Sequence, residues 1–88
     1  MEKKEICNAG SSVMINLGDF FVLVLVEKIE SLFVKYQIGR KEIGIFDKVE
    51  SGKIEEGKTI EIKLTDQEKS FFVEIQHNNS NSVKISYG

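Results

Sequence analysis

Basic side chains with aromatic neighbours gather in the middle of this 88-residue chain. Half of its twelve Lys and Arg residues lie there, at Lys35, Arg40, Lys41, Lys48, Lys53 and Lys58, and Tyr36 and Phe46 lie among them. RNA recognition uses cations on phosphates and aromatic rings that stack on bases. The pattern predicts a nucleic-acid site in which phosphates are contacted by Lys35, Arg40, Lys41 and Lys48, while Tyr36 or Phe46 stacks.

Acidic residues interleave with this basic segment and nearly neutralise it: Glu42, Asp47, Glu50, Glu55 and Glu56. The whole chain has a net charge of −2, so no global field draws it to nucleic acid or to anionic lipid. Mixed charges on solvent-facing strand positions also serve solubility alone. The same residues therefore fit either a local RNA site or an ordinary solvated surface.

Residues for catalysis or metal binding are scarce. Cys7 and His77 are the only thiol and the only imidazole, and they lie at opposite ends of the chain. Glu55 and Glu56 are adjacent, so their side chains point apart on an extended backbone. We therefore expect a protein that is not an enzyme and has no cofactor and no metal. The lone Cys fits a reducing cytoplasm better than a disulfide-bonded secreted domain.

The segment that must support any site is the apolar run from Phe20 to Val26, Phe-Phe-Val-Leu-Val-Leu-Val. Val at alternate positions favours an extended backbone, because branching at Cβ packs well on a pleated surface. Both faces of this strand are apolar, so both need cover from water. The run is far shorter than the roughly 20 residues that span a bilayer, so we expect no membrane association.

Alternating apolar positions continue through most of the chain, as in Leu32–Ile38, Ile60–Leu64, Phe71–Ile75 and Val83–Tyr87. Ile43, Ile45 and Val49 mark a further strand, whereas residues 50–58 look like a loop anchored by Ile54. Reversals every eight to twelve residues are typical of an antiparallel meander. The sequence predicts one all-β domain over residues 1–88, a small barrel or sandwich of five to seven strands, with residues 1–9 as a loose arm or edge strand.

The two apolar faces of Phe20–Val26 also raise the question of a partner subunit. Either later strands of the same chain cover the second face, or a second copy does, and we expect a homodimer. Two functions remain open for such a domain. One is RNA binding at the basic segment; the other is protein binding through an exposed strand edge or an apolar patch containing Phe33 or Phe72.

Residues 10–50 resemble the carbon storage regulator family of translational regulators. The resemblance lies in Gly10–Ile15, in Gly18-Asp19, in the strand ending at Glu27, in Val34-Lys35 and in Glu42–Ile45. It implies a homodimer of interleaved strands that binds GGA-containing messenger RNA. Phe46-Asp47-Lys48 stands where the family has its key Arg, so this residue is not matched.

Overall fold

The computed structural model describes residues 2–41, 46–67 and 69–88, and these form two antiparallel four-stranded sheets. The strands are β1 (Lys3–Asn8), β2 (Ser12–Leu17), β3 (Phe20–Ile29), β4 (Ser31–Arg40), β5 (Phe46–Lys53), β6 (Thr59–Thr65), β7 (Ser70–Asn79) and β8 (Ser82–Tyr87). One sheet has the order β2-β3-β4-β5, and the other has the order β1-β8-β7-β6. The all-β prediction is confirmed, and the form is a sandwich, not a closed barrel.

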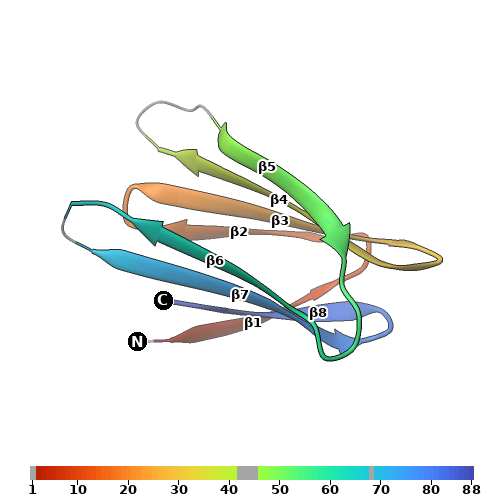
Figure 1. Cartoon of the computed structure of the whole chain (residues 1–88). Coiled ribbons are helices and arrows are strands. Elements are labelled where there is room, and N and C mark those ends of the chain that lie inside the picture. The colour runs from red at the N-terminus through yellow and green to blue at the C-terminus, as the bar shows by residue number, and fades with distance from the viewer. Residues whose placement is uncertain (1, 42–45, 68) are drawn as a thin grey trace.

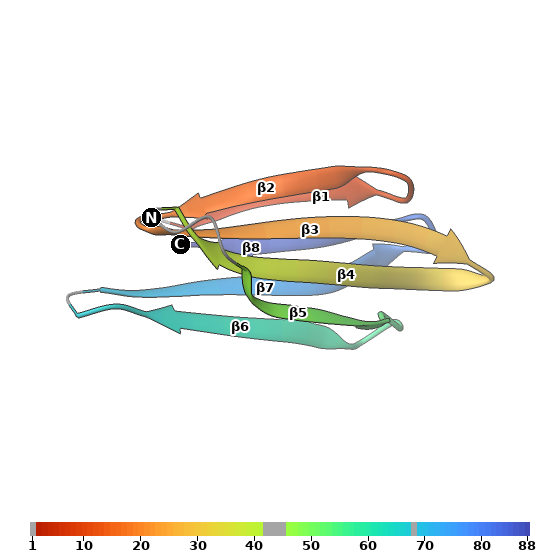
Figure 2. The same ribbon diagram turned by 90° about the horizontal axis from the view of Figure 1, so that it is seen from above.

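The chain changes sheets twice, between β1 and β2 and between β5 and β6 (Figure 1). Strands β2 to β5 and β6 to β8 are each a meander, while β1 pairs with β8 from the opposite end of the chain. The two sheets lie one over the other, as both views show (Figures 1 and 2). The described residues contain eight strands, more than the five to seven expected, and residues 1–9 contribute an edge strand.

The core lies between the sheets and is built from alternate residues of each strand. On β3, the even-numbered residues Phe20 to Val26 are buried, while Phe21, Leu23 and Leu25 on the other face are half-buried. The hydrophobic residues below 2% exposure come equally from both sheets: Ile15, Val22, Val24, Val26 and Val34 from one, and Cys7, Val73, Ile75, Val83 and Ile85 from the other. The second sheet therefore covers only one face of β3.

Tight reversals set the ends of the long central strands. Glu30 has a φ of 65° between Ile29 and Ser31, which pair across the hairpin, so the charged segment after β3 continues into a hairpin. At the other end of β3, Gly18 has a φ of 59°. The Phe71 ring packs on Gly18 and meets the Phe20 ring edge to face, with centroids 6.4 Å apart. This contact ties the two sheets together at that end.

The expected loop at residues 50–58 is only partly correct. Strand β5 extends to Lys53 and pairs with β4, with Lys53 opposite Phe33. Ile54 then anchors the crossing to the second sheet and is 2% exposed, as expected. Ile43 and Ile45 lie outside the described residues. None of the described residues is helical, so no helix long and apolar enough to cross a membrane occurs among them.

Candidate functional site

The basic residues predicted to bind nucleic acid are spread over different parts of the sandwich. Lys35 lies in the middle of β4 on the outer face, and its Nζ is 3.5 Å from Glu27 Oε1. Arg40 ends β4, with its guanidinium carbon 4.8 Å from the centroid of the Phe20 ring. The next residue, Lys41, is exposed, and its backbone N–H donates a 2.8 Å hydrogen bond to the carbonyl oxygen of Asp19.

The aromatic part of that prediction needs correction at Tyr36. Tyr36 is on the inner face of β4 and is only 6% exposed, so its ring packs in the core and is not open to a base. Phe46 and Lys48 lie on β5, where their backbones pair with Gly39 and Ile38, and their side chains are outside the described part of the structure. The described members of the set therefore do not form one basic surface with an exposed aromatic ring.

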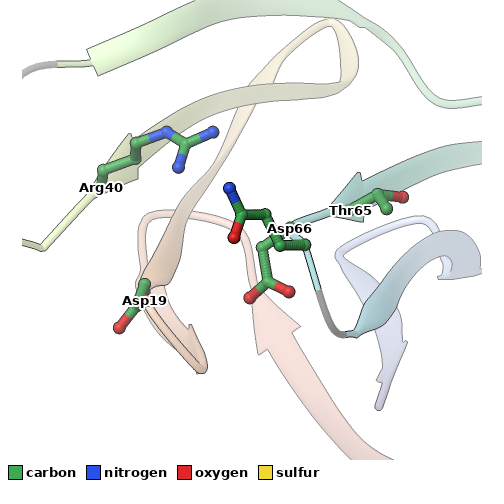
Figure 3. Close-up of a pocket in the computed structure, with 5 residues that line it drawn as sticks. Asp19, Arg40, Thr65 and Asp66 are labelled. Carbon is green, nitrogen blue, oxygen red and sulfur yellow. The ribbon is translucent and has the colours of Figure 1, made fainter.

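A pocket of about 570 Å³ opens beside Arg40 (Figure 3). The described residues that line it are Asp19, Arg40, Thr65, Asp66 and Gln67. In Figure 3 the Arg40 guanidinium points toward the middle of the pocket, while the Asp19 carboxylate points away from it. With two acidic residues and one guanidinium in its described lining, this pocket has no excess of positive charge, so it is poorly suited to a phosphate.

A second cavity of about 390 Å³ adjoins the first and shares Arg40 and Thr65 with it. It lies in the gap between β4 and β6, on a floor of core residues that includes Ile38, Ile62 and Leu64. Its charged lining is again mixed, with Glu61 and Lys63 next to Arg40. The two cavities thus adjoin on the side of the sandwich where Arg40 and Thr65 lie, and the described charged residues that line them are of both signs.

Cys7 and His77 come closer together than their positions in the sequence imply. Cys7 on β1 pairs with Val83 on β8, which pairs with His77 on β7. Two strand spacings separate them, about 10 Å, which is too far for a hydrogen bond between thiol and imidazole. Burial, and then the charge of Glu5, raise the pKa of the Cys7 thiol, so it stays protonated near neutral pH and is a poor nucleophile.

Metal binding has no support in the described ranges either. No group of three or more His, Cys, Asp and Glu side chains in residues 2–41, 46–67 and 69–88 could hold a metal ion.

The outer face of the β2-β3-β4-β5 sheet carries an apolar row along β3, with Met14 beside it and with Phe33 at one end, where Phe33 lies opposite Glu27 and Lys53. We call it the β3 outer patch, and it consists of Met14, Phe21, Leu23, Leu25 and Phe33. Directly opposite residues on antiparallel strands share a face, which places Met14 beside Leu23. Met14 is 50% exposed, and the other four are half-buried. Phe21 lies over Gly39, which has no side chain to push the ring away.

The outer face of the other sheet is mainly polar. Its cross-strand rows join Lys4, Ser86, Glu74 and Glu61, and then Ile6, Lys84, Gln76 and Thr59. Phe72 on β7 is opposite Lys63, and Ile6 lies on edge strand β1. The two apolar side chains are thus separated by charged and amide groups. We call this surface the polar outer face.

Fold and surface together define the chain as a small antiparallel β-sandwich with an apolar patch on one outer face and a mainly polar second outer face. No family model matches the sequence, and neither a curated protein nor a solved structure matches it. The resemblance to the carbon storage regulator family stays a prediction.

Proposed function

We propose that this protein is a non-catalytic recognition domain that acts in the cytoplasm by binding protein through the β3 outer patch. The observation that carries the proposal is the contrast between the two outer faces. Strands β3 and β7 are both interior strands of their sheets, yet β3 presents Phe21, Leu23 and Leu25 outward, where β7 presents Phe72, Glu74 and Gln76. A contiguous exposed apolar patch with a polar rim is typical of a protein-binding surface.

The composition of the patch and its rim supports this assignment. Met and Phe are enriched at the centres of protein interfaces, and the patch contains Met14, Phe21 and Phe33. Its neighbours are polar or charged: Ser12, Asn16, Glu27, Lys35 and Gln37.

The patch is also a better candidate than the edges of the β1-β8-β7-β6 sheet. Edge strands β1 and β6 carry Lys and Glu side chains, such as Lys4, Glu61 and Lys63, which discourage pairing with another strand. Of the two aromatic residues that the sequence leaves open, Phe33 lies in the β3 outer patch, whereas Phe72 lies on the polar outer face.

RNA binding, and with it a role as a translational regulator, has weaker support. Lys35 is ion-paired with Glu27, Tyr36 is in the core, and the Arg40 pocket is lined by Asp19 and Asp66 as well. An RNA site needs an excess of cations, with ring faces free to stack. The experiment that tests protein binding is therefore designed to detect RNA binding as the competing outcome.

The test is affinity capture from a lysate of the source cell, with and without nuclease, using four tagged forms of the chain. They are the natural sequence, Phe33→Ala, Phe72→Ala and the double variant Arg40→Glu/Lys41→Glu. We expect the natural chain to capture protein, its own untagged copy included, and nuclease to leave that capture unchanged. Phe33→Ala should reduce capture about tenfold or more, because it truncates an aromatic side chain in the patch.

Phe72→Ala is the matched control, since it removes the same side chain from the polar outer face. It should capture as the natural chain does, and so should the double charge reversal. Capture that nuclease abolishes, and that is lost with Arg40→Glu/Lys41→Glu but not with Phe33→Ala, would instead establish RNA binding and refute the proposal.

A further inference from the structure

We infer that the partner of the β3 outer patch is a second copy of this chain, packed face to face through the β2-β3-β4-β5 sheets. This inference rests on the proposed function, because it names the occupant of the same surface. Sheets that pack face to face bury the alternate residues that point out of each sheet. In such a dimer the outer residues of β3 would lie between two sheets, as its inner residues do within one chain.

The size of the face suits a dimer. The shortest extent of the molecule, 16 Å, is that of two stacked sheets, so the longer extents of 40 and 26 Å span the sheet faces. The face thus offers on the order of 1,000 Å², and a stable interface needs roughly 800 Å² from each partner. A second copy brings a surface of the same dimensions and can cover the whole patch.

The charges beside the patch favour a copy over an unrelated partner. A two-fold interface uses the same surface on both chains, so it must be complementary to itself. Glu27 on β3 and Lys35 on β4 are neighbours of opposite sign on this face, and the exposed Lys53 lies opposite Phe33. Each chain therefore offers both an acid and a base, which can pair across the interface as well as within the chain.

Stability gives a further reason for self-association. A domain of 88 residues buries a smaller share of its chain than a larger one does and has little stability to spare. Covering the half-buried Phe21, Leu23 and Leu25 adds to the apolar area removed from water. Binding of folded copies to one another then stabilises the fold by mass action, so the melting temperature should rise with protein concentration.

The first experiment is sedimentation equilibrium over a wide concentration range with the natural chain, Leu23→Glu and Gln76→Glu. Leu23 and Gln76 are both half-buried outer-face residues on interior strands, and each substitution adds one negative charge. The natural chain and Gln76→Glu should shift from monomer to dimer as concentration rises. Leu23→Glu should weaken dimerisation roughly 100-fold or more, because each two-fold contact is lost twice. Circular dichroism checks that each variant is folded.

The second experiment separates contacts between chains from effects within one chain. Glu27→Lys places two cations side by side, and Lys35→Glu places two carboxylates there. Each variant alone should dimerise several-fold more weakly than the natural chain, since like charges then face each other in a two-fold dimer. An equimolar mixture should regain association as a heterodimer, which native mass spectrometry distinguishes by mass when one of the two variants is uniformly labelled with a heavy nitrogen isotope. Failure of the mixture to associate more tightly than either variant alone would count against the two-fold contact.

A folded natural chain that stays monomeric at every concentration overturns this inference, as does a Leu23→Glu variant that dimerises normally. The proposed function would survive the first of these results if Phe33→Ala still abolished nuclease-resistant capture of a different protein. It would fail as well if capture were insensitive to Phe33→Ala. Sedimentation therefore tests the dimer, and selective capture tests the proposed protein-binding function.

Discussion

The two outer faces of this sandwich differ in polarity, although their strands have the same backbone geometry. On β7, Glu74 and Gln76 point outward, as expected of a sheet with one solvated face. On β3, Leu23 and Leu25 occupy the matching outward positions, and they are only half-buried in the single chain. Alternation of polar and apolar residues is therefore kept over this part of β7 and lost on β3.

The comparison shows which residues are explained by folding of one chain and which are not. The inward residues of both sheets, such as Val24 and Ile75, are fully buried and account for the core. The outward residues of β7 are compatible with water. The β3 outer patch has no role in the single chain, and an interface would give it one.

The largest expected effect comes from placing a carboxylate on either side of β3. Val24→Asp would bury an unpaired charge at a position that is 0% exposed. This should cost at least about 3 to 5 kcal/mol, a large part of a small domain's net stability of about 5 to 15 kcal/mol, so the variant should be mostly unfolded. The neighbouring Leu23→Asp should fold but remain monomeric. Circular dichroism with urea titration measures the first effect, and sedimentation measures the second.

The adjacent residues Val24 and Leu23 control for each other, since both lie in the centre of the same strand. If Leu23→Asp unfolded the chain as completely as Val24→Asp, the outer face would be part of the folding core. The contrast between core and interface on β3 would then be lost.

A smaller effect is expected at Gly39, where the outer patch depends on a missing side chain. A Cβ at this position would overlap the Phe21 ring. Gly39→Ala should therefore force the ring off the sheet and cost about 1 to 3 kcal/mol, measured by urea unfolding. Dimerisation should weaken too, because Phe21 belongs to the patch.

Gly52 on β5 is the control for that substitution, since no atom lies within 4 Å of the Cβ it would acquire. Gly52→Ala should be neutral or stabilise by up to about 1 kcal/mol, because alanine restricts the unfolded chain more than glycine does. Equal unfolding free energies for the two alanine variants would show that Phe21 does not depend on Gly39.

Local patterns predict much of this fold. The apolar run Phe20–Val26 indicates a strand with two faces to cover, and the structure places it in the interior of a sheet with one face toward the second sheet and the other face outward. The alternation from Leu32 to Ile38 assigns Tyr36 to the same face as Val34, and both are buried. This periodicity therefore argues against Tyr36 as a residue that stacks on a base. The basic residues near Tyr36 in the sequence do not reveal that its side chain faces the core.

Other features depend on contacts between distant residues. The pairing of β1 with β8 brings Ile6 opposite Lys84, and no local pattern encodes such a partner. Residues 50–53 look like a loop because Ser51 and Gly52 favour turns, yet hydrogen bonding to β4 holds them in an edge strand. The polar outer face, too, emerges only once the order β1-β8-β7-β6 is known.

The smallest expected effect concerns Cys7, which faces the core from the edge of the sheet with the polar outer face. Burial, and then the charge of Glu5, raise the pKa of this thiol in the folded chain. An acid with a raised pKa in the folded state contributes stability that is complete below its unfolded pKa, about 8.5, and is lost as pH rises through the folded value. The unfolding free energy should thus decline above about pH 8.5, and Cys7→Ala should remove part of that decline.

Glu5 also accepts a 3.1 Å hydrogen bond from the Tyr87 hydroxyl, whose pKa is raised by burial and then by this bond. Tyr87 adds a decline of its own at still higher pH, so the comparison with Cys7→Ala is made below pH 10. Native Cys7 should react slowly with a thiol reagent, and its rate should fall with protein concentration no further than dimerisation stabilises the fold, because β1 is not in the proposed dimer interface. A labelling rate that fell further than the measured rise in the free energy of unfolding would place β1 in the interface and contradict the assignment to the β3 outer patch.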